Sequence, residues 1–158
     1  MIVIADSSAL VALSMCQCLP VLEQLFNEIK VPEAVFKEVC ILEKPEAATL
    51  ESWLKYRVCT VSLSKYNLVR ADNLGQGERE AIALYLAESA ELLIIDDARA
   101  KRIAYLNGLE VMGSMGVLLL AKRKGLIKHI RSLLEILENT DIHLSHAVVQ
   151  KVLNLANE

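Results

Sequence analysis

Two groups of carboxylates follow continuous apolar runs, and they are the first residues whose type and position suit chemistry. Asp6 follows M-I-V-I-A, and Asp96 and Asp97 follow E-L-L-I-I. Such runs are typical of strands buried on both faces in parallel sheets packed between helices. Because the ligand crevice of these sheets lies beyond the carboxyl ends of the strands, we expect Asp6 there. Of the Asp pair, we assign Asp96 to the crevice and Asp97 to capping the following helix.

Glutamates in two helical segments are the other candidates. Glu38 projects beside the apolar face of a helix predicted over 33–39. Glu78 and Glu80 fall in the first turn of a helix predicted from Gly77, where the helix dipole favours carboxylates. Residues two apart point about 200° apart on a helix, so at most one of this pair should face the crevice. For all three, an ordinary helix-surface role is the alternative.

Acids gathered in one crevice repel one another unless a cation is present. A ligand set made only of carboxylate oxygens, without His or Cys, suits a hard ion such as magnesium or manganese. One or two such ions can activate water and stabilise the leaving oxygen in phosphodiester cleavage. The distribution of acids therefore favours metal-assisted hydrolysis.

Composition narrows the classes of protein. The 158 residues predict a single domain, 1–158, and 54% of them are hydrophobic. Uncharged stretches such as Val111 to Ala121 are well short of the roughly 20 apolar residues of a spanning helix. The N-terminal region is a poor signal peptide, because Asp6 interrupts its apolar stretch. We therefore expect a cytoplasmic protein that uses its surplus apolar surface in an interface. The net charge of −3 argues against nucleic-acid binding by bulk electrostatics.

Strand and helix patterns alternate along the chain. After the first strand, strands are predicted at 30–32, 57–63, 91–95 and 109–112, and helices at 19–29, 33–39, 45–54, 77–90, 98–107 and 117–124. A turn is predicted at 113–116, and the pattern is helical from Leu126 to the end. This alternation predicts a three-layer α/β/α domain with a mostly parallel sheet of about five strands, a core at 1–125 and C-terminal helices at 126–158.

The acids stand within sequence motifs that are distributed from residue 4 to residue 153. These are I-A-D-S-S-A-L at 4–10, V-P-E-A-V-F-K-E-V at 31–39, L-G-Q-G-E-R-E-A-I-A-L at 74–84, L-L-I-I-D-D at 92–97, G-S-M-G-V-L-L-L-A-K-R-K-G-L-I at 113–127 and L-S-H-A-V-V-Q-K-V-L at 144–153. In this order they resemble the PIN-domain ribonuclease family, and more closely the prokaryotic PIN-like group related to VapC toxins. Ser114 stands where that group commonly has Thr, and it keeps the hydroxyl.

The resemblance implies a PIN fold and an endoribonuclease that depends on Mg²⁺ or Mn²⁺. It also implies the toxin of a type II toxin–antitoxin pair, with RNA as substrate, a cognate antitoxin as partner and a homodimer as the assembly. The catalytic acids it implies are Asp6, Glu38, Glu78 and Asp96, with Glu80 and Asp97 as alternates. Among these, Asp6, Glu78 and Asp96 would be metal ligands, and Ser8 would be a supporting residue.

A basic surface is needed to hold RNA against an acidic site. Arg99, Lys101 and Arg102, on one predicted helix, are candidates for it, although a solvated helix face is the alternative. A catalytically inactive PIN-like module that binds protein or RNA is the competing function. We assign no catalytic role to His143 or His146.

Overall fold

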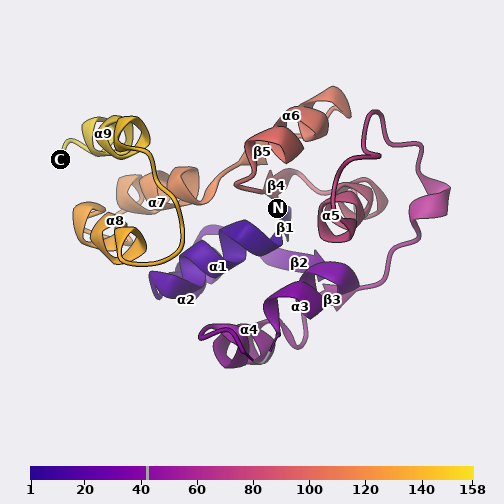
Figure 1. Ribbon diagram of the computed structural model, residues 1–158, viewed down its shortest axis with the longest axis horizontal. Helices are drawn as coiled ribbons and strands as arrows, with labels where there is room; N and C mark the ends of the chain where they lie inside the picture. The colour runs from indigo at the N-terminus through magenta and orange to yellow at the C-terminus, as the bar shows by residue number, and fades with distance from the viewer. Residues whose placement is uncertain (42) are drawn as a thin grey trace.

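The computed structural model describes residues 1–41 and 43–158, and in that part of the chain a five-stranded parallel sheet has the order β3-β2-β1-β4-β5. The strands are β1 (Ile2–Ala5), β2 (Glu28–Pro32), β3 (Val58–Cys59), β4 (Leu92–Ile94) and β5 (Val111–Met112). The central strand β1 pairs with β2 and β4, so that Val3 lies between Ile29 and Leu92. Figure 1 shows β1 and β4 near the middle of the molecule.

Both faces of β1 are covered, which explains its continuous apolar sequence. Successive side chains of a strand point to opposite faces. Val3 and Ala5 belong to one hydrophobic cluster and Ile4 to a second, and all three are fully buried. The predicted three-layer α/β/α arrangement, with an all-parallel sheet, is therefore confirmed.

The helices are distributed unequally over the two faces of the sheet. They are α1 (Ser7–Met15), α2 (Leu19–Leu25), α3 (Glu33–Val39), α4 (Ala47–Leu54), α5 (Gln76–Ala87), α6 (Ala98–Leu106), α7 (Ser114–Arg123), α8 (Arg131–Glu138) and α9 (His146–Leu155), with a 3-10 turn at Leu63–Lys65. The buried residues of α5 and α6 join Ile4 and Leu93 in one cluster. Those of the other helices join Val3 and Ile94 on the opposite face.

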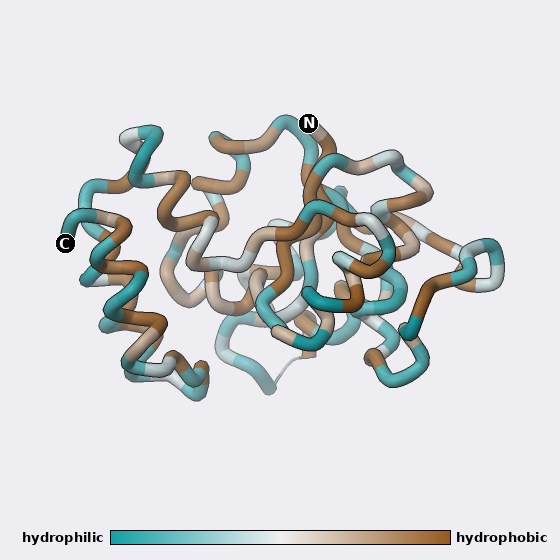
Figure 2. Tube along the Cα trace, turned by 90° about the horizontal axis from the view of Figure 1, so that it is seen from above, coloured by the Kyte–Doolittle hydropathy of each residue, from teal (hydrophilic) through white to brown (hydrophobic). Residues whose placement is uncertain are grey.

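The C-terminal helices pack on the same core as the N-terminal half. Leu134 of α8 and Val149 of α9 belong to the cluster that contains Val3. Helix α7 contacts α1, α2 and α9. These helices gather at the left in Figure 1, opposite the loop between β3 and α5. Figure 2 shows hydrophilic and hydrophobic residues alternating along the helix beside the C-terminus, as expected for a helix with one buried face.

Several predicted boundaries were wrong. The helix predicted over 19–29 ends at Leu25, and Ile29 is a strand residue that pairs with Val3. The strand predicted over 57–63 is only Val58–Cys59. Residues 114–116, predicted as a turn, form the first turn of α7, and Gly113 is the residue before it. Residues 139–145 interrupt the predicted helical tail between α8 and α9.

Across residues 1–41 and 43–158, no single helix combines the length and apolar composition that a membrane crossing requires. Helices α1 and α2 reach both only when taken together, and they are bent by 111° at the break between them.

Candidate active site

Asp6 lies where β1 ends and α1 begins, and its side chain is only 3% exposed. The backbone is fixed there because the Asp6 amide donates to the Ile94 carbonyl of the adjacent strand at 2.9 Å. The Ser8 hydroxyl donates to Oδ2 at 3.4 Å. No group in the described part of the chain hydrogen bonds to Oδ1, which is buried.

Burial raises the pKa of Asp6 to about 7, from an ordinary value of 3.8. The negative charges of Glu78 and Glu38 contribute to this rise in the pKa, and hydrogen bonds from the Ser7 amide and the Ser8 hydroxyl oppose it. Desolvation and like charges both disfavour the ionised form of a carboxyl group. A bound cation would reverse this balance, because it favours the ionised form.

Glu38 is held between α1 and α5. The Ser7 hydroxyl donates to Oε2, and the Gly77 amide donates to Oε1 at 3.2 Å. A Cβ at position 77 would lie 2.5 Å from Oε1 of Glu38, so a side chain there would force the Glu38 carboxylate to move. Gly77 therefore allows α3 and α5 to bring Glu38 into the site.

The two glutamates of α5 have different surroundings. Glu78 accepts from the amide of Gly75, the residue before α5, at 3.0 Å, and its charge acts on Asp6. Glu80 accepts from the Ala34 amide at 3.0 Å, so it joins α5 to the first turn of α3. These contacts favour Glu78 as the site acid and give Glu80 a structural role.

The Asp pair also divides its roles. Asp97 caps α6, because its Oδ1 accepts from the Ala100 amide at 2.8 Å, as predicted. Asp96 accepts from the Ser114 amide at 2.6 Å and from the Ser114 hydroxyl at 2.7 Å. Ser114 is buried, so Asp96 is fixed against the first turn of α7.

The structure brings the predicted acids to one region. A cavity of about 470 Å³ is lined by Ser7, Ser8, Glu38 and Asp96, together with apolar side chains and Lys44. Asp6, Glu38 and Glu78 interact electrostatically. In residues 1–41 and 43–158, no three or more Asp, Glu, His or Cys side chains stand close enough to hold a metal ion as they are placed.

The chemistry of the donors nevertheless fits a hard divalent cation. The buried oxygen Oδ1 of Asp6 has no hydrogen-bond donor within the described residues, and the side chains whose charges act on Asp6 are the carboxylates of Glu78 and Glu38. Asp6, Glu38 and Glu78 are the acids whose charges interact in this region. Asp96 has both oxygens bonded to Ser114, so it contacts the cavity through an already occupied carboxylate.

The three basic residues that were predicted to bind RNA differ in their burial. Arg99 and Arg102 are exposed, whereas Lys101 is half-buried and lines a second cavity that also contains Asp96. Position 113 shows how close this residue lies to the acid, because a Cβ there would be 2.7 Å from Nζ of Lys101 and 2.9 Å from Oδ1 of Asp96. Lys101 is thus the member of this group that reaches the acidic region.

Sequence reasoning missed the contributions of Ser7 and Gly77. Ser7 follows the first acid directly, and Gly77 precedes Glu78 in the G-Q-G-E motif, so both stand beside predicted site residues. Their contacts with Glu38 depend on the packing of α3 against α1 and α5, which sequence spacing does not describe.

A family model described as PIN domain matches residues 2–158. No curated protein and no solved structure matches the chain significantly.

Proposed function

The chain belongs to the PIN-domain family, a generally nucleolytic fold, and from this membership and its acidic site we propose that it is a divalent-metal-dependent endoribonuclease. The observation that carries the proposal is the buried Oδ1 of Asp6, without a hydrogen-bond donor among the described residues. A buried polar atom without a partner is costly, so its retention needs an explanation. An ion at this oxygen would provide one.

We assign the four acids to one ion site and their hydrogen-bond partners to the orientation of these acids. Asp6, with Glu78 and Glu38, would hold Mg²⁺ or Mn²⁺, and this ion would activate water and stabilise the charge that develops on the phosphate. Ser7 and Gly77 orient Glu38, and Ser8 orients Asp6, through the hydrogen bonds already described. Ser114 orients Asp96 toward the same region, where we propose that it contributes as a further metal ligand.

The experiment is cleavage of a mixed RNA pool by purified protein with magnesium, with manganese and with a chelator. The test variant is Asp6→Asn and the matched control is Asp97→Asn, since Asp97 caps α6 and lies outside the proposed acid set. We expect metal-dependent cleavage by the wild type and the control, and a loss of at least a hundredfold in Asp6→Asn. Undiminished cleavage by a folded Asp6→Asn protein would contradict the proposal.

A catalytically inactive module that binds protein or RNA is the second candidate. It is favoured by the hydrogen bonds from Ser114 that engage both oxygens of Asp96, and by the lack of a three-ligand cluster in the described residues. Isothermal titration with Mg²⁺ and Mn²⁺ separates the two candidates. The nuclease requires binding that is lost in Asp6→Asn, and no binding at millimolar ion would favour the module.

We further propose that the protein acts in the cytoplasm as the toxin of a type II toxin–antitoxin pair, and that it forms a homodimer. The motif series supports the toxin role, and the exposed apolar side chains of Leu106 and Leu155 support a partner-binding surface. Induced expression in a bacterial host should arrest growth, whereas Asp6→Asn should not. Light scattering on the purified chain tests the dimer, and a monomer throughout the micromolar range would contradict it.

A further inference from the structure

A second cavity, of about 460 Å³, opens beside the acidic site. Its walls come from α6, the first turn of α7, the α8–α9 connection and α9. Its volume lies within the range of about 300–1,000 Å³ that is common for small-molecule sites. It is therefore large enough for one small planar group with its polar substituents.

The two cavities share a wall. Asp96 and Ile142 line both of them, so the second cavity adjoins the cavity of Ser7, Ser8 and Glu38 at these two residues. A substrate that extends from the acids past Asp96 reaches the second cavity directly. A chain molecule such as RNA, with one unit at the acids and the next beyond Asp96, matches this layout.

The lining has a polar part and an apolar part. Ser114 donates its hydroxyl to Asp96, and Ser145 accepts from the Val148 amide, so both serve the protein itself. Lys101 and His143 add a cation and an imidazole to the wall. Met115, Leu144 and Val148 form an apolar surface around them. An apolar surface with an imidazole suits the face and edge of a base, and an ammonium group suits a phosphate.

We propose that this cavity is a nucleotide subsite, which binds the base of the nucleotide next to the scissile phosphate. His143 would contact this base, and Lys101 would contact the phosphate of the same nucleotide. The subsite rests on the proposed nuclease function and deepens it, since it would make the enzyme select its cleavage position by the identity of one neighbouring base. Ile142 would separate this base from the reacting phosphate.

The test uses the four nucleoside 5′-monophosphates as probes and methyl-labelled full-length protein observed by NMR. We expect at least one of them to shift the methyl signals of Met115, Leu144 and Val148, the apolar part of the lining. His143→Ala should weaken this binding on the order of tenfold, as is common when a stacking partner of a base is removed. Lys101→Gln should also weaken it, and added salt should reduce the difference between Lys101→Gln and the wild type.

His143 and Lys101 each have a matched control residue nearby in the sequence. His146→Ala removes an exposed imidazole at the start of α9, and Arg102→Gln removes an exposed cation from α6, and neither residue lines the cavity. Binding unchanged by both controls supports the subsite. The inference would be overturned by no methyl shifts at 10 mM, taken as roughly the weakest useful range for a fragment-sized ligand, or by equal losses in the control variants.

A cleavage readout separates the failure of this inference from the failure of the proposed function. In a randomised RNA pool, wild-type cleavage should show a base preference at one position beside the cut, and His143→Ala should reduce that preference. Cleavage with no base preference and no nucleotide-dependent shifts would reject the subsite and leave the nuclease. Nucleotide binding in the cavity without any RNA cleavage would reject the nuclease and leave a nucleotide site.

Discussion

At the scale of the residue, the site depends on Asp6, a buried acid whose ionised form the fold disfavours. Burial holds the pKa of Asp6 at about 7, so folding favours its neutral form. In the unfolded chain the group ionises at its ordinary value of 3.8. The contribution of Asp6 to stability is therefore full below about pH 3.8 and is lost as the pH rises through about 7.

The loss of the stabilising contribution of Asp6 at high pH gives a prediction for the protein without divalent ions. At pH 8 in chelator, Asp6→Asn should be more stable than the wild type by up to a few kcal/mol, because the amide removes the buried charge. At pH 3.5 or below, the two should unfold together. Chemical denaturation at the two pH values measures the difference, and a variant less stable than the wild type at pH 8 would contradict the expected sign.

The same variant tests the ion. Millimolar Mg²⁺ should raise the thermal midpoint of the wild type, because a ligand that binds only the folded state stabilises it. Asp6→Asn should show no such rise. An equal rise in both proteins would place the ion elsewhere.

The two acids of α5 give a second prediction at this scale. Glu78→Gln should reduce RNA cleavage by at least tenfold with little change in stability, since a glutamine oxygen still accepts from the Gly75 amide. Glu80→Gln is the matched control, and it should retain activity because its oxygen still accepts from the Ala34 amide. Initial cleavage rates at saturating magnesium measure both. The reverse order would move the site role to Glu80.

At the scale of the element, the packing of α3 on α5 places Glu38. Gly77→Ala should displace the Glu38 carboxylate, because the new Cβ would lie 2.5–2.9 Å from its atoms. We expect a large loss of cleavage with a smaller loss of stability. Gly75→Ala is the control from the same motif, since a Cβ there would meet Glu78 Oε2 only at 3.8 Å, an ordinary contact. Cleavage rates and thermal midpoints of the pair test this, and equal activity in both variants would contradict it.

Elements with strong local patterns were predictable from the sequence. The helix over 33–39 has the predicted bounds, and β1 and β4 lie within the two continuous apolar runs. The prediction failed at Ile29, whose spacing from Leu22 and Phe26 fits a helix although it pairs with Val3 in the sheet. Strand pairing between distant segments decided that residue, and no local pattern records it.

The candidate site also contains residues that could be predicted from local sequence and contacts that could not. Acids that follow buried strands could be identified because the crevice of a parallel sheet lies at those strand ends. The choice of Asp97 as a helix cap also followed from its local position, and the structure confirms it. The approach of Gly77 to Glu38, and of Gly113 to Lys101 and Asp96, could not be predicted, because each brings together segments that are separated in the sequence.

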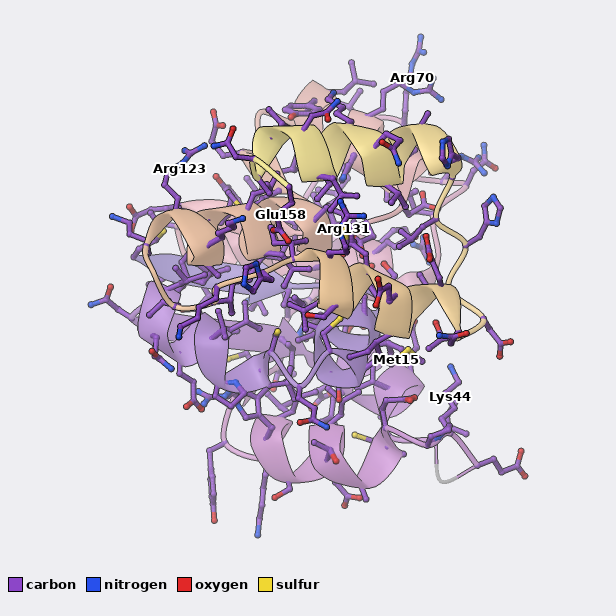
Figure 3. All side chains as sticks on the ribbon, turned by 90° about the vertical axis from the view of Figure 1, so that its left-hand side faces the viewer. Met15, Lys44, Arg70, Arg123, Arg131 and Glu158 are labelled. Atoms are coloured by element: carbon purple, nitrogen blue, oxygen red, sulfur yellow. The ribbon has the colours of Figure 1, made fainter. Side chains whose placement is uncertain are left out.

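At the scale of the whole molecule, Glu158 ties three helices together. Its Oε2 accepts from Nζ of Lys122 at 2.7 Å and from the Ile130 amide at 2.7 Å, and its Oε1 accepts from the Arg131 amide at 3.1 Å. Figure 3 shows Glu158 and Arg131 near each other, between α9 and the helices beneath it. This carboxylate therefore joins the end of α9 to α7 and to the start of α8.

The pKa of Glu158 gives a prediction of opposite sign to that of Asp6. Desolvation opposes its ionisation, but Lys122 and the two amides outweigh it and lower the pKa from 4.5 to about 2. Its stabilising contribution is therefore present above about pH 4.5 and is lost as the pH falls toward 2. Glu158→Gln should be less stable than the wild type at pH 6, and this difference should shrink by pH 3. Glu138→Gln, an exposed acid at the end of α8, is the control, and a difference that does not change with pH would contradict the prediction.

The position of β1 at the centre of the sheet also governs when the site comes into existence during synthesis. The ribosome makes this strand before one of its two neighbours, β4, which begins at Leu92, and before the helix that fixes Asp96, which begins at Ser114. Until these segments have left the ribosome, Asp6 lies on an incomplete sheet. The proposed nuclease would therefore stay inactive until both segments have left the ribosome and packed beside β1.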